Sequence, residues 1–226
     1  WMGHLVQSSN ILALILLLVI AAILSPHFLS VRNIFNVLRG ASLVGIVAIG
    51  MTFVILNRGI DLSVGSIVGF SAALAATFAP YGVIPAILVA LAAGLGLGLV
   101  NGLLITALGL QPFIATLGML IFARGLVFVH TNGSNIVVEH PSDAFQFLGS
   151  GYVGPVPAPV ILFVLVWLIS AWVLRYTVFG REIYAVGANE EAARLSGIDV
   201  NRNKVLVYCV SGFLAGLAGF VMASRL

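Results

Sequence analysis

The residue types that usually perform catalysis or bind metals are scattered through this sequence rather than grouped. The four histidines, His4, His27, His130 and His140, lie at ends or in polar stretches, and none forms a pair at metal-ligand spacing. No Gly-x-Ser-x-Gly motif is present, and the single cysteine, Cys209, lies in an apolar run. The sequence predicts no catalytic residue, no metal site and no cofactor.

The densest group of charges lies at residues 175–204, which hold nine of the 17 charged residues. Asn189 is a good helix N-cap, acidic residues follow in the first turn, and a glycine stands where the helix should end. This pattern predicts a short helix of about two turns that presents Asn189, Glu190, Glu191, Ala192, Arg194 and Gly197. It is either an ordinary surface helix or a docking element for a partner protein.

A second polar interruption, at residues 57–66, separates two apolar runs. Gly59 and Gly65 allow unusual backbone angles, and Asp61 or Ser63 can cap the helix that follows. One interpretation is a tight capped turn at the membrane surface. The other is a broken helix that faces a water-filled path, because irregular backbone within a membrane needs protein or a cavity around it.

Four further polar residues lie in or between apolar runs. Asn101, Gln111 and Thr116 could bind a neutral polyol by hydrogen bonds, or could bond between helices. Arg124 lies within an apolar run, where an arginine usually faces protein, water or the interface. It could either reach outward to the interface or line a pathway.

The elements that must position these residues are membrane spans. The chain has 226 residues, 61% of them apolar and 8% charged, with a mean hydropathy of +1.18. An ordinary soluble domain carries about 25% charged residues, so a soluble enzyme is excluded. No basic cluster alternates with aromatic residues, so nucleic-acid binding is not indicated.

Apolar runs long enough to span a bilayer predict an all-α, polytopic transmembrane bundle with about seven spans. The predicted spans are residues 10–29, 34–56, 63–78, 83–108, 112–129, 159–174 and 205–223. Gly94, Gly98 and Gly102 repeat at four-residue spacing, as do Gly212 and Gly216, which predicts faces for close helix packing.

Two polar segments predict the orientation of a single transmembrane domain over residues 1–226. Residues 131–158 contain no Lys or Arg, whereas residues 175–204 contain five. Because basic residues are retained on the cytoplasmic side, the first segment is predicted to be an external loop and the second a cytoplasmic loop. Counting spans backwards places the N-terminus in the cytoplasm.

Several blocks, in order, resemble the permease subunits of bacterial ABC sugar importers, in the branch for ribose, xylose, arabinose and galactose. The blocks are GIDLSVGS at residues 59–66, QPFIATL at 111–117, RG at 124–125, YAVG at 184–187 with Asn189, and ARLSGIDVN at 193–201. Residues 131–134 and 194–201 are most similar to the ribose permeases of that family. The similarity runs from about residue 24 to the end of the sequence.

The resemblance implies a homodimeric permease in the bacterial inner membrane, with a cytoplasmic ATP-binding subunit and a periplasmic sugar-binding protein as partners. The helix at residues 189–197 would be its ATPase-coupling helix. The sequence departs from the family at Arg58, where a small residue is expected. The family's further C-terminal spans are absent, so we expect an incomplete chain.

From these observations we expect the membrane subunit of an ATP-driven importer of a neutral, ribose-like monosaccharide, with ATP hydrolysis in a partner. The alternative is a stand-alone sugar facilitator or channel, which would move its solute without ATP. A membrane-embedded enzyme would need a nucleophile and base or a metal site, and the sequence offers neither.

Overall fold

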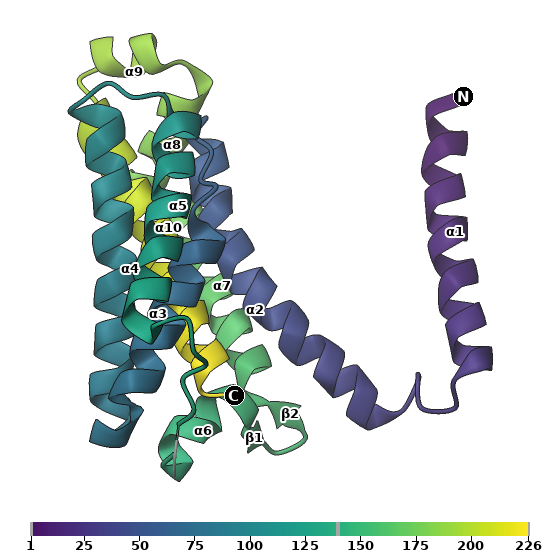
Figure 1. Ribbon diagram of the computed structural model, residues 1–226. Coiled ribbons are helices and arrows are strands. Elements are labelled where there is room, and N and C mark those ends of the chain that lie inside the picture. Colours follow the sequence, from purple (N-terminus) through teal and green to yellow (C-terminus); the bar gives the residue numbers. More distant parts are fainter. Residues whose placement is uncertain (1, 139–140, 226) are drawn as a thin grey trace. The chain divides into compact units, whose positions relative to one another are not determined.

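The computed structural model describes residues 2–138 and 141–225, with side chains from residue 11 onward. Glu139, His140 and the side chain of His4 therefore lie outside the described residues. Figure 1 shows the elements of the described part, which are α1 (Met2–Leu24), α2 (Val31–Leu56), α3 (Val64–Phe78), the 3-10 helix η1 (Ala79–Tyr81), α4 (Val83–Thr106), α5 (Pro112–Thr131), α6 (Asp143–Ser150), β1 (Tyr152–Val153), β2 (Val156–Pro157), α7 (Ala158–Tyr176), α8 (Val178–Ala188), α9 (Glu190–Leu195) and α10 (Val200–Ala223).

The predicted all-α membrane bundle is confirmed. Among the described residues, six helical segments are long and apolar enough to cross a membrane: α2, α3 with η1, α4, α5, α7 and α10. The first predicted span corresponds to a shorter apolar stretch, Ile11–Leu24 within α1. The last span begins earlier than predicted, at Val200, because Asp199 caps it by accepting a hydrogen bond from the Arg202 amide.

The chain forms two compact units, Trp1–Gly40 and Ala41–Leu226, and the boundary falls within α2. In the first unit, a bend joins α1 to α2. The Asn33 side chain donates to the Phe28 carbonyl at 2.8 Å, and Ser30 Oγ accepts from the Asn33 amide. Ser30 thus satisfies an amide at the start of α2.

In the second unit, α10 is the central helix. In its most apolar 18-residue stretch, 61% of the residues are buried, against 11–28% in the other spans. It packs mainly on α4 and α3. A Cβ atom on Gly98 would collide with the Tyr208 carbonyl, and one on Gly102 would lie 2.8 Å from the Val205 Cα. We call the facing residues Gly94, Gly98 and Gly102 of α4 and Gly212 and Gly216 of α10 the glycine seam; the packing role predicted for them is confirmed.

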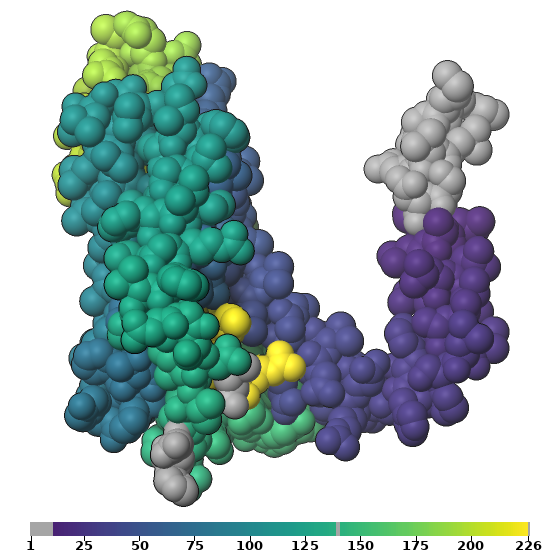
Figure 2. Space-filling model, viewed as in Figure 1, coloured from purple at the N-terminus to yellow at the C-terminus, as the bar shows by residue number. Residues whose placement is uncertain are grey.

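The two predicted loops lie at opposite ends of this unit, with α6, β1 and β2 at one end and α9 at the other (Figures 1 and 2). Each loop contains a helix that was not predicted from the sequence, α6 in the first and α8 in the second. Ser142 Oγ accepts from the Phe145 amide and starts α6, whose Phe145 is 1% exposed. Thr177 Oγ1 accepts from the Gly180 amide and starts α8. Local capping created helices that hydropathy did not reveal.

Candidate functional site

The polar segment at residues 57–63, which we call the signature turn, joins α2 to α3 in the interior of the second unit. Asn57, Asp61 and Ser63 are buried, the last two completely. Arg58 has a φ of 57°, in the left-handed region that favours glycine. Arg58 and Ile60 are exposed, so the turn has a buried polar side and an open side. Its place in a membrane, as a capped surface turn or as a broken helix that faces a water-filled path, stays a prediction.

Asp61 is the centre of a buried hydrogen-bond network. Its Oδ1 accepts from the Ser63 amide at 3.0 Å and from Ser63 Oγ at 2.6 Å, and its Oδ2 accepts from Ser211 Oγ at 2.9 Å. Asn101 on α4 donates to Ser63 Oγ at 2.9 Å. Within the described part of the chain no Lys or Arg forms an ion pair with Asp61, so hydroxyl and amide donors alone stabilise the carboxylate.

One face of α10 supplies the partners of both polar regions. Lys204, Tyr208 and Ser211 follow each other at steps of four and three residues, the spacing of one helix face. Tyr208 donates to the Ile60 carbonyl at 3.1 Å and Ser211 donates to Asp61, whereas Lys204 reaches α9. A single helix therefore contacts the signature turn and the predicted docking helix.

The predicted short helix is present as α9. Asn189 Oδ1 accepts from the Ala192 amide at 3.1 Å, which makes it the N-cap. Gly197, with a φ of 84°, follows the helix end in the left-handed conformation. Ala193 is buried against Val186 and Val200, so the helix is attached along one side.

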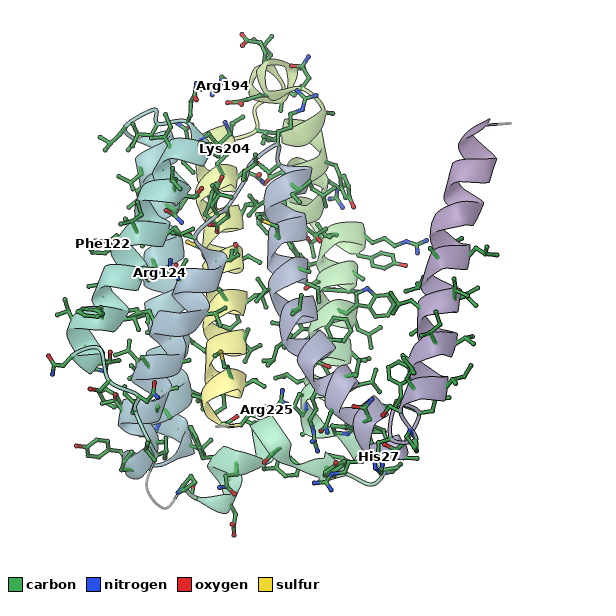
Figure 3. The ribbon with its side chains drawn as sticks, turned by 45° about the vertical axis from the view of Figure 1, so that its right-hand side comes forward. His27, Phe122, Arg124, Arg194, Lys204 and Arg225 are labelled. Atoms are coloured by element: carbon green, nitrogen blue, oxygen red, sulfur yellow. The ribbon has the colours of Figure 1, made fainter. Side chains whose placement is uncertain are left out.

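Charges hold α9 on α10. Lys204 Nζ lies 2.8 Å from Glu190 Oε2, and Arg194 lies 3.4 Å from Glu190 Oε1. The hydrogen bond from Lys204 holds the pKa of the Glu190 carboxyl below its usual range, and Arg194 adds to the effect. Figure 3 shows Arg194 and Lys204 at one end of the bundle and Arg225 at the other.

The outer side of α9 is exposed, although Arg194 also pairs with Glu190. Leu195 is 82% exposed, and Glu191, Ala192 and Arg194 are also exposed. The docking role predicted for this exposed side of the helix stays a prediction. Glu190 thus has a different place from Glu191: it attaches the helix, whereas Glu191 faces outward.

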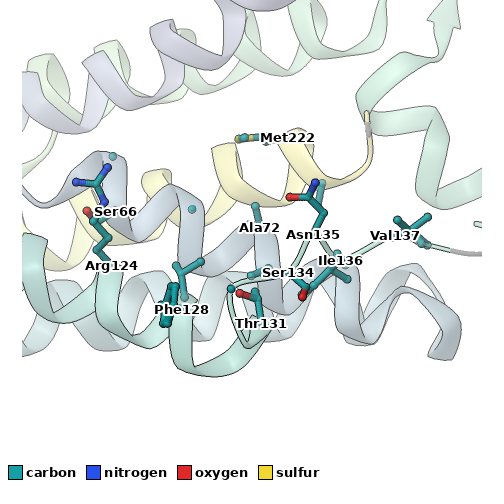
Figure 4. A pocket seen from close by; sticks show the side chains of 18 of the residues that line it. Ser66, Ala72, Arg124, Phe128, Thr131, Ser134, Asn135, Ile136, Val137 and Met222 are labelled. Carbon is teal, nitrogen blue, oxygen red and sulfur yellow. The ribbon is translucent and has the colours of Figure 1, made fainter.

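A cavity of about 1090 Å³ opens between α3, α5, the segment after α5 and the end of α10. Arg124 lines it from α5, and Ser66 lines it from α3 (Figure 4). Thr131, Ser134 and Asn135 add polar groups, and small residues of α3 leave the space. The cavity offers hydrogen-bond donors and acceptors beside apolar surface, a combination that suits a polar solute.

The four candidate pathway residues have different environments, and their role stays a prediction. Arg124 is exposed and lines the cavity, between the two ends of the bundle (Figure 3). Asn101 and Thr116 are fully buried; Thr116 donates to the Pro112 carbonyl at 2.8 Å. Gln111 is exposed at the start of α5 and makes no side-chain cap.

Sequence reasoning missed three residues of this region: Tyr208, Ser211 and Asn203, whose side chain accepts a 2.6 Å hydrogen bond from Asn57. Tyr208 and Ser211 lie inside the last apolar run, where they were counted only as parts of a span. Their spacing with Lys204 on one helix face is the signal that could have identified them.

The comparisons with known proteins find permease proteins of transport systems. The protein-family model described as branched-chain amino acid transport system / permease component matches residues 33–226. The ribose import permease protein RbsC of Escherichia coli (strain K12) is 42% identical over 226 residues, 98% of this chain and 70% of that protein. RbsC of Bacillus subtilis (strain 168) is 46% identical over 217 residues, 95% of this chain and 67% of that protein.

A relative with another named sugar is the L-arabinose ABC transporter permease protein AraH of Azospirillum brasilense. It is 37% identical over 222 residues, which are 97% of this chain and 65% of that protein. No solved structure matches the chain significantly.

Proposed function

Since the chain belongs to the family of branched-chain amino acid transport system permease components, we propose that it is the membrane-spanning subunit of an ATP-driven importer of a neutral monosaccharide. The sugar is proposed from its relatives, whose names include ribose, L-arabinose, fructose and galactofuranose. A ribose-like pentose is the first choice, because the RbsC relatives are 42–46% identical over almost the whole chain.

The observation that carries the proposal is α9, a capped helix with an exposed apolar residue at the end of a membrane bundle. We propose that it is the coupling helix and docks on a separate cytoplasmic ATP-binding subunit. Leu195 and Glu191 would contact the partner, while Glu190 keeps the helix on Lys204. The end with α9 would be cytoplasmic, since five basic residues lie in residues 175–204, and the N-terminus would lie on the same side.

The other end of the bundle would receive the sugar. There, residues 131–158 would meet a periplasmic sugar-binding protein, and a second copy of the permease would complete the pathway in the inner membrane. The cavity lined by Arg124 and Ser66 is the proposed place of sugar contact in each copy. Asn101, Gln111 and Thr116 would contribute only when the spans have moved.

The ATPase drives transport by having different contacts with two states of the permease. ATP binding would bring two ATPase subunits together, and the α9 helices would move with them. Rigid-body rocking of packed spans would then open the cavity to one side of the membrane at a time. This chain contributes binding and movement, and the partner contributes hydrolysis.

The first test is uptake of labelled pentoses and hexoses into vesicles that contain the full-length protein. Uptake is expected only when the ATPase subunit, ATP and the sugar-binding protein are all present. Uptake by this protein alone, without ATP, would instead establish a stand-alone facilitator.

The second test replaces Glu190, Glu191 and Arg194 together with Ala. ATP hydrolysis by the partner should continue while sugar uptake falls, because the two subunits lose their contact. Arg202→Ala, an exposed residue near the same end, is the matched control. Unchanged uptake in the triple variant would contradict the coupling role of α9.

A further inference from the structure

Arg58 occupies a backbone position that suits glycine. Its φ is 57°, and in the described residues only Asn132 shares a positive φ among non-glycine residues. A glycine would adopt this conformation without the steric conflict of a Cβ atom. The backbone conformation therefore gives no reason for an arginine at this position.

Its side chain reaches the helix before α9. Arg58 Nη2 donates a 2.8 Å hydrogen bond to the carbonyl of Ala188, the last residue of α8. A cation there satisfies a carbonyl that has no partner in its own helix and interacts favourably with the helix dipole. The next residue, Asn189, is the N-cap of α9.

Backbone packing holds the same junction. A Cβ atom on Gly187 would collide with the Leu56 carbonyl, so the end of α8 lies directly on the end of α2. Beside this contact, Asn57 donates to Asn203 on α10 at 2.6 Å. The junction between α8 and α9 therefore contacts both the end of α2 and the start of the signature turn, which is itself bonded to α10.

The other half of the turn is attached to the interior. Tyr208 donates to the Ile60 carbonyl, Ser211 donates to Asp61, and both donors belong to α10. A Cβ on Gly59 would lie 2.7 Å from Tyr208 Oη, so no larger residue fits between them. Asp61 is also linked to α4, because it accepts a hydrogen bond from Ser63 Oγ, which in turn accepts one from Asn101.

We propose that Arg58 is a positioning residue that links the docking helix α9 to the signature turn, so that displacement of α9 moves the adjoining ends of α2 and α3. This inference rests on the proposed function. In this proposal the signature turn transmits movement from α9 to the spans α2 and α3. Arg58 acts through Ala188 and touches neither sugar nor nucleotide.

The test compares Arg58→Gly with Arg202→Ala in the complete transporter, because alanine keeps the first turn of α10 helical. Arg58→Gly deletes the side chain but keeps the backbone conformation favourable, so thermal stability and ATPase binding should stay at the wild-type level. Sugar taken up per ATP hydrolysed should fall about tenfold, the effect of one hydrogen bond to a charged group on an equilibrium. Arg58→Lys should recover part of the ratio.

Hydrogen exchange on the permease alone supplies a readout that does not depend on ATP. Amides at residues 189–192 should exchange faster in Arg58→Gly than in wild type and remain unchanged in Arg202→Ala. An unchanged uptake ratio, or unchanged exchange, would overturn the link. Wild-type uptake that needs no ATP would overturn the proposed function instead, and faster exchange in Arg58→Gly would still support the link.

Discussion

The glycine seam and the signature turn both bring neighbouring elements onto α10, but by opposite means. In the seam, backbone meets backbone because no side chain intervenes, and nothing larger fits. At the turn, α10 holds its neighbour through Tyr208 and Ser211, whose hydrogen bonds can open and re-form. The seam is suited to a rigid body, and the turn is suited to a place where such bodies move relative to each other.

The largest expected effect comes from filling the seam. Gly98→Leu should lower the free energy of unfolding by about 3 kcal/mol, the upper end of overpacking costs, because its Cβ meets the Tyr208 carbonyl. Gly96→Leu is the control on the same helix, since a Cβ there has no atom within 4 Å. Thermal unfolding in detergent measures the stability of both variants. Equal stability would contradict the claim that the glycine seam has no room for a larger side chain.

Removing the hydrogen bonds of the signature turn should lower the free energy of unfolding less than filling the glycine seam. Asp61→Ala leaves the hydroxyls of Ser63 and Ser211 without their acceptor in the interior, so we expect a loss of about 1–3 kcal/mol. Asp143→Ala, which removes an exposed carboxylate from α6, serves as the comparison in the same unfolding assay. If the two variants lose equal stability, the buried hydrogen bonds of Asp61 stabilise the protein no more than an exposed carboxylate does.

The smallest effect belongs to the attachment of α9. Because the pKa of Glu190 is lowered in the folded protein, its ion pair stabilises above the ordinary carboxyl pKa of 4.5. This contribution is lost as the pH falls through the lowered value. With its carboxylate half exposed, the pair should contribute no more than about 1 kcal/mol.

Glu190→Gln should therefore show a smaller loss of stability between pH 7 and pH 3 than the wild type. Glu191→Gln, one residue away and outside the ion pairs of Glu190, should follow the wild-type curve. Identical curves for wild type and Glu190→Gln would mean that Lys204 does not hold α9 in solution.

The sequence predicted the bundle and its spans well, because long apolar runs have few alternatives in a membrane. Its capping signals also predicted α9, since Asn189, two acids and Gly197 each satisfy a local requirement of a short helix. These features depend on neighbouring residues, which a single sequence displays.

The partners of Asp61 could not be predicted in the same way. Ser211 lies 150 positions away and Asn101 reaches the carboxylate only through Ser63, so tertiary packing decides both contacts. For the same reason α8 was missed: Thr177 caps it, but its apolar side is short and packs on the ends of α2 and α10. Arg58 looked like a departure from a family pattern until its contact with Ala188 was known.

The central position of α10 has a consequence for how the protein is made. Asp61 leaves the ribosome long before Ser211, and at roughly 5–20 residues per second the 150 positions between them take about 8–30 s to translate. During that interval α2 and α3 enter the membrane with a carboxylate whose later partner does not yet exist. The insertion machinery or water near the membrane surface must solvate this carboxylate until α10 inserts. Delayed or failed insertion of α10 would therefore leave the turn without its partners and expose it to quality-control proteases.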